Sequence, residues 1–374
     1  MIDTEPTVED LVGAVTATDQ RAAAAARERH TRLAKPPGSL GRLEELGARL
    51  SAISGRCPPP VPAAPVVVVA SADHGVHAQG VSHWPQSVTE LMVATMAAGG
   101  AAVNAIARVV TADITVLDVG TLTAGPVPFG VRDARIRPGT RDLTAKPAMT
   151  IQECRAAITA GAGATRELLA AGADLVVTGD IGIANTTATA CLICAFTGAA
   201  PAAVIGRGAN PDDARIPAKL QAVEAALARH GDDRDALATL ASLGGLEHAA
   251  LVGVILAGAG ARVPVVVDGV IAGAGALAAG ALCSDTLGYL VAGHASAEPG
   301  AQDILGRLGQ PALLDLGMRL GEGTGALLAV PLIQAAARVL TDVDTLDDVL
   351  NAGGRAQADV EGAETPTAIR SDQG

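Results

Sequence analysis

Past residue 60, the chain alternates short, continuously apolar runs with Ala-rich segments of helical spacing. Buried strands have this pattern, because a strand that is covered on both faces has no polar side. Apolar strands separated by helices predict a parallel sheet with helices on both faces, and therefore an α/β fold. The predicted strands cover residues 65–70, 114–117, 175–177 and 263–267 and, less clearly, 202–205 and 289–291.

The first sixty residues have a different pattern. Residues 8–33 are rich in Ala and Arg with helical spacing, Lys35–Gly41 (KPPGSLG) breaks the helix, and a second helix is expected over 42–54. The run Cys57–Pro62 (CPPPVP) predicts a stiff connector, because consecutive prolines cannot join a sheet or a helix interior. It is the clearest boundary in the chain. From about residue 353 the sequence lacks periodicity, which predicts a disordered tail.

Composition narrows the class of protein. Of 374 residues, 49% are hydrophobic, which predicts a large core, and the aromatic share of 1% means that Ala, Val, Leu and Ile must fill it. The net charge of -12 argues against sequence-independent nucleic-acid binding. Five scattered cysteines form no disulfide framework and favour a reducing compartment. The polar N-terminus predicts no signal peptide, and no uninterrupted apolar run is long enough for a membrane span, so we expect a cytoplasmic protein.

Four predicted strands end in an acid close to a glycine, namely Asp73, Asp118, Asp180 and Asp268. Asp and Gly are common turn residues, so one such ending says little. In an open parallel sheet, however, ligands bind outside the carboxyl ends of the strands. Four repetitions therefore mark this edge of the sheet as the expected active face.

Glu322 is the strongest candidate for catalysis. It stands between Gly321 and Gly323, directly before an apolar segment that is predicted to be helical from Gly325. Glycine permits positive φ and close approach to a ligand, so the carboxylate should lie on a tight loop at a helix start. There the helix dipole favours its ionised form and apolar surroundings its neutral form, as in a tuned general base. The alternative is a helix cap.

A second polar loop holds Asp73, His74, His77, His83 and Trp84. Three imidazoles and a carboxylate could suggest a metal site, but the spacing matches no zinc pattern, so we expect a substrate loop and no metal. Trp84 could be a core plug or a surface on which a flat aromatic substrate stacks, and its loop position favours stacking.

Three features could hold an anion. The segment Gly179–Thr187 (GDIGIANTT) runs from strand through a glycine loop into a helix, which offers free backbone N–H groups. A second glycine loop contains Gly206 and Gly208, and Lys219 follows it, although a solvated helix lysine is the default interpretation. Neither a Walker A motif nor a dinucleotide fingerprint is present.

Taken together, these motifs resemble the nicotinate-nucleotide:dimethylbenzimidazole phosphoribosyltransferases of cobalamin biosynthesis. They occur in the family's order and cover residues 33–339. The combination is far more specific than any single motif. The motifs are Lys35–Glu44 (KPPGSLGRLE), Ala72–Val76 (ADHGV), Gly182–Thr187 (GIANTT), the Gly206 and Gly208–Asn210 loop, Asp268–Gly269, the His294 and Ser296–Glu298 loop, and Met318–Gly323 (MRLGEG).

The resemblance implies a Rossmann-like parallel six-stranded sheet over residues 61–325 and a small helical domain formed by 1–60 and 326–352, with 353–374 as the tail. It also implies a homodimer in which the small domain covers the neighbour's active site. The implied reaction transfers the phosphoribosyl group of nicotinate mononucleotide to 5,6-dimethylbenzimidazole, without a cofactor. The products are nicotinate and α-ribazole 5′-phosphate.

The family also implies roles for single residues. Glu322 aligns with the catalytic base, and Asp180 would be an auxiliary acid, one methylene shorter than the Glu of some members. The implied nucleotide-binding residues are Gly179, Gly182, Asn185, Thr186, Gly206, Gly208, Lys219, Asp268, His294 and Ser296. The implied base-binding residues are Asp73, His74, His83, Trp84 and Leu320.

Two other functions compete with this one. A Rossmann-like oxidoreductase would fit the fold, but the missing dinucleotide fingerprint argues against it. A non-catalytic nucleotide-binding protein would bind nicotinate mononucleotide without releasing nicotinate. The base itself also stays open, because adenine and other benzimidazoles are flat and apolar too.

Overall fold

The computed structural model describes residues 6–210 and 212–352, so the predicted disordered tail lies outside the described residues. Within this part the chain forms a parallel six-stranded sheet in the order β3-β2-β1-β4-β5-β6. This confirms the predicted Rossmann-like α/β fold. The strands are β1 (Pro65–Ala72), β2 (Asp113–Gly120), β3 (Val131–Asp133), β4 (Leu175–Ile181), β5 (Val265–Val267) and β6 (Leu290–Ala292).

The strand prediction fails at two places. Residues 202–205 were expected to be a strand, but they fall mostly within the short helix α8 (Pro201–Val204), where Pro201 occupies the first turn. Proline is favoured there because its fixed φ suits a helix start. The edge strand β3 escaped prediction because its sequence, Val-Arg-Asp, has neither the length nor the apolar run of a buried strand.

The sheet order places a topological switch point between β1 and β4. β1 is paired with β2 on one side and with β4 on the other, all in parallel. The chain therefore leaves in opposite directions from these two neighbouring carboxyl ends, which opens a crevice for a ligand.

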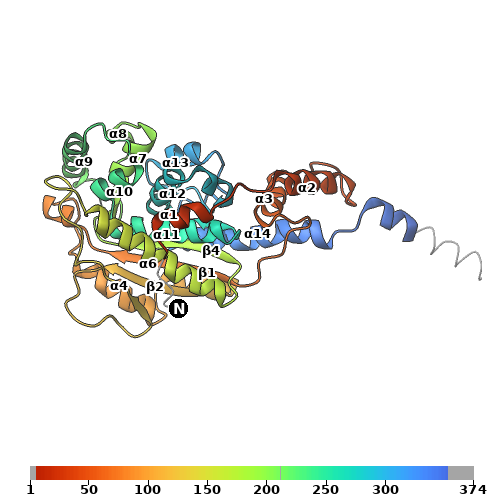
Figure 1. Cartoon of the computed structure of the whole chain (residues 1–374), viewed down its shortest axis with the longest axis horizontal. Helices are drawn as coiled ribbons and strands as arrows, with labels where there is room; N and C mark the ends of the chain where they lie inside the picture. Colours follow the sequence, from red (N-terminus) through yellow and green to blue (C-terminus); the bar gives the residue numbers. More distant parts are fainter. Residues whose placement is uncertain (1–5, 211, 353–374) are drawn as a thin grey trace, which may run out of the picture. The chain divides into compact units, whose positions relative to one another are not determined.

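Helices α6 (Ile151–Ala170) and α11 (Leu246–Gly260) pack against each other and along the sheet (Figure 1). Two glycines permit this close approach. A Cβ on Gly161 would lie 2.0 Å from the Ala250 carbonyl oxygen, and one on Gly253 would lie 1.9 Å from that of Ile158. The core is accordingly built from small and aliphatic side chains, as the composition predicts.

The other helices connect the strands or flank the sheet. Their bounds are α1 (Val8–Ala14), α4 (Ser87–Ala97), α5 (Ala102–Val110), α7 (Asn185–Thr197), α9 (Ile216–His230), α10 (Ala236–Leu243), α12 (Val270–Leu282), α13 (Ala301–Leu308), α14 (Thr324–Asp342) and the 3₁₀ turns η1 (Gly75–Gln79) and η2 (Ser284–Tyr289).

The described chain divides into two compact units. The larger comprises residues 6–18 and 62–334, and the smaller comprises 19–61 and 335–352. Two predicted bounds differ from this division. Residues 6–18 were assigned to the small domain, but α1 packs on α6 and α11 of the larger unit, and the first turns of α14 also belong to the larger unit.

The smaller unit contains α2 (Gln20–Arg32), α3 (Arg42–Ser54) and the end of α14. The helix expected over 42–54 is confirmed. The helical pattern predicted over 8–33, in contrast, is broken, because Asp19 caps α2 and accepts hydrogen bonds from the Arg21 and Ala22 N–H groups. Ala26, Ala48 and Leu340 form the core of this unit.

By length and composition alone, two helical segments could span a membrane, which the sequence analysis did not expect. They are Ser87–Val110 and Thr324–Asp342. The first is two helices, α4 and α5, separated at Gly99 and Gly100. The second contains Pro331 and has a largely buried window, as the core helices of other proteins do.

Candidate active site

The loop Gly321–Gly323 has three consecutive residues with positive φ, at 85°, 64° and 86°. Such a value is rare for Glu322, because its side chain is strained in this region, and strained residues of this kind cluster at functional sites. Below the loop, a Cβ on Gly179 would lie 2.7 Å from the Glu322 carbonyl oxygen. The loop therefore rests directly on β4, as the predicted tight loop at a helix start requires.

Asp268, and not Glu322, caps helix α14. The Asp268 carboxylate accepts hydrogen bonds from the backbone N–H groups of Gly323 at 3.3 Å and Ala326 at 2.8 Å. The Glu322 carboxylate accepts instead from the Val103 N–H at 3.3 Å, in the first turn of α5. The helix-cap interpretation of Glu322 therefore does not hold for the helix that follows it.

Burial raises the pKa of the Glu322 carboxyl above its ordinary value. The Val103 N–H opposes this rise, and the nearby charge of Asp268 adds to it. A carboxylate with a raised pKa is a stronger proton acceptor. Glu322 is only 3% exposed, yet it borders a cavity, so it can contact a ligand while it stays largely shielded from solvent.

This cavity, which we name the acidic cavity, has a volume of about 600 Å³. It lies at the carboxyl ends of β4, β5 and β6, beside the switch point, as the acids at the strand ends predict. Its size suits a small-molecule ligand. The predicted site residues that line it are Trp84, Asp180, Gly182, Asn185, Thr186, Gly208, His294, Ser296, Leu320 and Glu322.

Asp180 is the second buried acid of the acidic cavity. Its Oδ2 accepts a hydrogen bond from Asn185 Nδ2 at 3.1 Å, whereas its Oδ1 has no partner among the described residues. Burial, followed by the charges of Asp268, Glu247 and Glu322, raises the pKa of the Asp180 carboxyl well above its ordinary value. The raised pKa favours the protonated acid, and one oxygen is left for a ligand.

Behind the lining residues Thr186 and Gly208 lies a buried lysine, and the Glu298 carboxylate accepts from the Gly208 N–H at the same place. Lys219 is 3% exposed, and its Nζ donates to Thr186 Oγ1 at 2.9 Å and to the Gly206 carbonyl at 2.8 Å. Burial lowers the pKa of Lys219 to about 8, although Glu298 opposes this. The default interpretation of Lys219 as a solvated lysine is thus wrong, and the lysine lies next to Gly208 of the second glycine loop.

An apolar part of the wall lies beside the same glycine loop. Trp84 is 42% exposed at the cavity, and its indole N–H donates to the Ala209 carbonyl at 2.9 Å. The His83 ring meets the Trp84 ring edge-on at 5.6 Å between centroids, but His83 itself is not in the cavity lining. Of the two interpretations of Trp84, the surface for a flat ligand fits this placement, and the core plug does not.

Several predicted residues lie behind the cavity wall. Asp73 accepts hydrogen bonds from Thr89 Oγ1 and the Leu122 N–H, and His74 is fully buried against Glu247, so neither reaches the lining as expected of base-binding residues. The three imidazoles of the possible metal site also have different neighbours, since His77 bonds to the Trp84 carbonyl. The remaining residues behind the wall are Gly179, Gly206, Lys219 and Asp268.

The structure adds residues that the sequence analysis did not select. Arg319 lines the cavity, donates to the Gly208 carbonyl and lies 4.0 Å from Glu298. Arg319 and Glu298 both lie within the motifs that resemble the family, so those motifs could have identified them as candidate site residues. Val88 and Met92 extend the apolar wall, and their i, i+4 spacing on α4 places them on one helix face.

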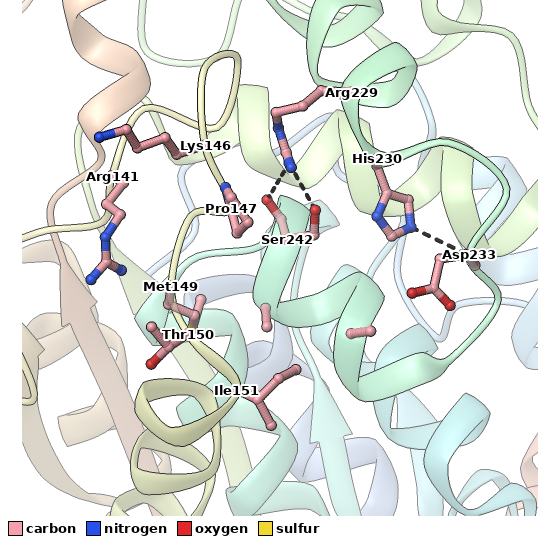
Figure 2. Close-up of a pocket in the computed structure, with 12 residues that line it drawn as sticks. Arg141, Lys146, Pro147, Met149, Thr150, Ile151, Arg229, His230, Asp233 and Ser242 are labelled. Atoms are coloured by element: carbon pink, nitrogen blue, oxygen red, sulfur yellow. Dashed lines mark hydrogen bonds between the residues drawn. The ribbon is translucent and has the colours of Figure 1, made fainter.

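A second cavity, the basic cavity, has a volume of about 560 Å³ and shares no lining residue with the acidic cavity (Figure 2). Its arginines already have partners. Arg229 donates to the Leu143 carbonyl and to both oxygens of Ser242, and Arg141 pairs with Glu153. These bonds give the basic cavity a structural role and leave the acidic cavity as the candidate active site.

Comparison with known proteins agrees with this geometry. Residues 15–349 match a family model described as phosphoribosyltransferase. The chain is 51% identical to the nicotinate-nucleotide–dimethylbenzimidazole phosphoribosyltransferase of Salinispora tropica, over 91% of this chain and 98% of that protein. It is 47% identical to the enzyme of the same name from Chromobacterium violaceum, over 88% and 96%.

A solved structure shows the same fold. The crystal structure of nicotinate-nucleotide-dimethylbenzimidazole phosphoribosyltransferase from Thermus thermophilus matches with a TM-score of 0.84 and 44% identity, covering 88% of this chain and 98% of that one.

Proposed function

This chain belongs to the nicotinate-nucleotide–dimethylbenzimidazole phosphoribosyltransferase family, and we propose that its acidic cavity catalyses the family's reaction. The reaction transfers the phosphoribosyl group of nicotinate mononucleotide to 5,6-dimethylbenzimidazole, in assembly of the cobalamin nucleotide loop. The products are α-ribazole 5′-phosphate and nicotinate.

Glu322 is the general base of this reaction. One nitrogen of dimethylbenzimidazole attacks C1′ of the ribose while Glu322 takes the proton from the other nitrogen, so the base becomes neutral as the new bond forms. The C1′–N bond to nicotinate breaks, and its electron pair neutralises the pyridinium ring. No carboxylate needs to attack C1′, so the reaction inverts the β-nucleotide to the α-product, whereas a carboxylate nucleophile would give retention.

The two sides of the acidic cavity accommodate the two substrates. The phosphate binds beside Thr186 and Gly208, where the ammonium of Lys219 behind the lining compensates its charge. The Gly208 N–H itself donates to Glu298. Trp84 and Leu320 form the wall on which the flat base stacks. Asp180 lies between them and meets the ribosyl group.

The proposal extends to assembly and location. A cytoplasmic homodimer without a cofactor is what the resemblance implies, with the two units acting as domains.

One observation carries the proposed function: a strained glutamate, which does not cap the helix that follows it, borders a cavity with a tryptophan in its wall and a buried lysine behind its lining. The test is to incubate the protein with nicotinate mononucleotide and a panel of bases. We expect nicotinate release and an α-ribazole phosphate whose anomeric configuration is read by NMR, with dimethylbenzimidazole preferred over adenine. Binding without nicotinate release, or a β-product, would contradict it.

A further inference from the structure

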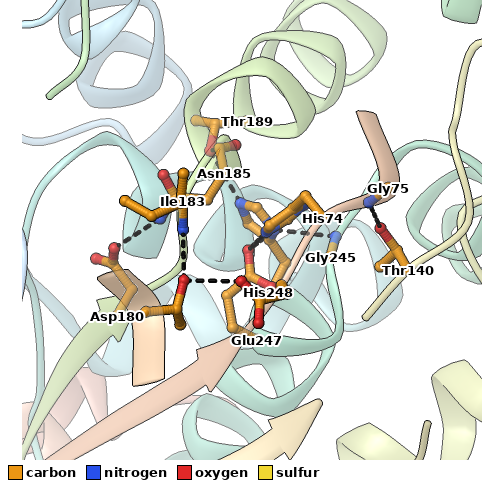
Figure 3. A network of polar contacts seen from close by, with 12 residues as sticks. His74, Gly75, Thr140, Asp180, Ile183, Asn185, Thr189, Gly245, Glu247 and His248 are labelled. Carbon is orange, nitrogen blue, oxygen red and sulfur yellow. Dashed lines mark hydrogen bonds and ion pairs between the residues drawn. The ribbon is translucent and has the colours of Figure 1, made fainter. Parts of the chain in front are cut away.

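Behind the wall of the acidic cavity lies a group of buried ionisable side chains that the reaction above does not use. His74, Glu247 and His248 each have fully buried side chains. Glu247 Oε1 lies 2.9 Å from His74 Nε2 and 2.8 Å from His248 Nδ1. We name these three residues the buried triad (Figure 3).

Within the triad, Glu247 and His74 favour their charged forms although both are buried. Burial alone would raise the pKa of the Glu247 carboxyl, but the charge of His74 and its hydrogen bond, with His248 adjacent, overcome it, so the pKa lies below its ordinary value. His248 Nδ1 also accepts a hydrogen bond from the Gly245 N–H at 3.0 Å. Burial likewise opposes a charged His74, yet Glu247 raises the His74 pKa. A buried ion pair gains little stability over an apolar replacement, so its presence calls for another reason.

From His248 two hydrogen bonds lead to the backbone of Asn185, whose side chain contacts Asp180 at the cavity. His248 Nε2 lies 3.0 Å from Thr189 Oγ1, and Thr189 donates to the Asn185 carbonyl at 2.9 Å. The side-chain Nδ2 of Asn185 donates to Asp180 Oδ2 at 3.1 Å, and Figure 3 shows these residues beside the triad. The other oxygen of this carboxyl, Asp180 Oδ1, is buried and has no partner among the described residues.

A second contact ties the triad to the same wall. Gly182 lines the acidic cavity, and a Cβ on it would lie 3.4 Å from His74 Nε2 and 2.4 Å from the Ala72 carbonyl oxygen. Only the glycine backbone thus separates His74 from the cavity. The triad therefore supports the cavity wall both at Gly182 and at Asn185.

We propose that His74, Glu247 and His248 are positioning residues, which fix Asn185 and through it hold Asp180 against the phosphoribosyl group of the substrate. This inference rests on the proposed function. Asp180 acts as a protonated donor to a ribosyl oxygen, and its Oδ2 is held by Asn185 so that Oδ1 faces the ligand. Burial first, and then the charges of Asp268, Glu247 and Glu322, favour this protonated form.

Thr189→Val tests the link alone, because it removes the hydroxyl between His248 and Asn185 and keeps the side-chain shape. Thr165→Val is the matched control: Thr165 is also buried in a helix and donates to a carbonyl four residues back, Gly161 O at 2.9 Å, without touching the triad. We expect Thr189→Val to lower kcat/KM for nicotinate mononucleotide roughly 3- to 10-fold relative to Thr165→Val, the factor of about one net hydrogen bond. Both should melt at similar temperatures.

Glu247→Gln tests the charge, since it keeps the shape of the side chain. The titration of Asp180 is followed by carboxyl ¹³C NMR, with its signal assigned by its loss in Asp180→Asn. Removing the negative charge and its hydrogen bond to His74 should shift the pH at which Asp180 loses its proton, an effect that a merely structural role would not produce. If Glu247→Gln does not fold, the Thr189 comparison alone decides.

An Asp180 signal that titrates unchanged in Glu247→Gln, or a Thr189→Val enzyme that matches Thr165→Val, would overturn the inference. Either result in an active parent enzyme leaves the proposed function intact. A parent enzyme that releases no nicotinate would instead contradict the proposed function itself.

Discussion

The two cavities of the larger unit differ in whether their ionisable side chains have hydrogen-bond partners. In the basic cavity, Arg229 and Arg141 have their hydrogen bonds filled by Ser242, the Leu143 carbonyl and Glu153. In the acidic cavity, one oxygen of Asp180 is left without a partner among the described residues. Other described residues also have buried atoms without a hydrogen-bond partner, but among the residues that line the two cavities these atoms belong to Asp180 and His294 of the acidic cavity, where a ligand can complete them. Volume alone would not separate the two cavities, since they measure about 560 and 600 Å³.

The largest expected effect is on Glu322. Gln keeps the shape of the side chain and its hydrogen bond to the Val103 N–H but cannot take up a proton, so Glu322→Gln should slow nicotinate release roughly 10²–10⁴-fold. It should melt near the parent temperature and still bind both substrates. Asp268→Ala is the stability control, because loss of the α14 cap should cost about 0.5–2 kcal/mol in a thermal melt. Near-parental turnover of Glu322→Gln would exclude Glu322 as the general base and leave Asp180 as the candidate.

A smaller effect is expected at the phosphate corner. Lys219→Ala should raise the KM for nicotinate mononucleotide roughly tenfold to a hundredfold, the value of a charged hydrogen bond, and change the KM for the base far less. Since burial places the pKa of Lys219 at about 8, kcat/KM for the nucleotide should fall as pH rises through that value and the lysine loses its charge. Equal changes in both KM values would argue against this assignment.

The smallest effect on activity is expected in the basic cavity. Arg229→Ala should leave kcat unchanged but cost about 1–3 kcal/mol of unfolding free energy, because the Leu143 and Ser242 oxygens lose their donor. Lys146→Ala, at an exposed side chain of the same cavity, is the control and should change neither. A drop in kcat for Arg229→Ala would mean that the two cavities do not differ as described.

The sequence predicts the fold well because period and composition are local signals. The strand ending at Asp180 and the loop around Glu322 could both be located from apolar runs and flanking glycines. The direction of a side chain is not a local signal. Asp73 and His74 stand in the right loop but point to Thr89 and Glu247, and Glu247 comes from a helix 173 residues later. Such partners are set by packing between distant segments, which spacing does not reveal.

The central claim is that Glu322 accepts the proton that the attacking base loses. It is tested most directly by chemical rescue with formate, a small carboxylate that can occupy the space of a missing side chain. Glu322→Gly removes the carboxylate and suits the positive φ of 64°, whereas Glu322→Gln keeps the space filled. Formate should restore nicotinate release in Glu322→Gly with saturating dose dependence and leave Glu322→Gln unchanged. Full activity of Glu322→Gly without formate would contradict the account. Equal rescue of Glu322→Gly and Glu322→Gln by formate would contradict it too.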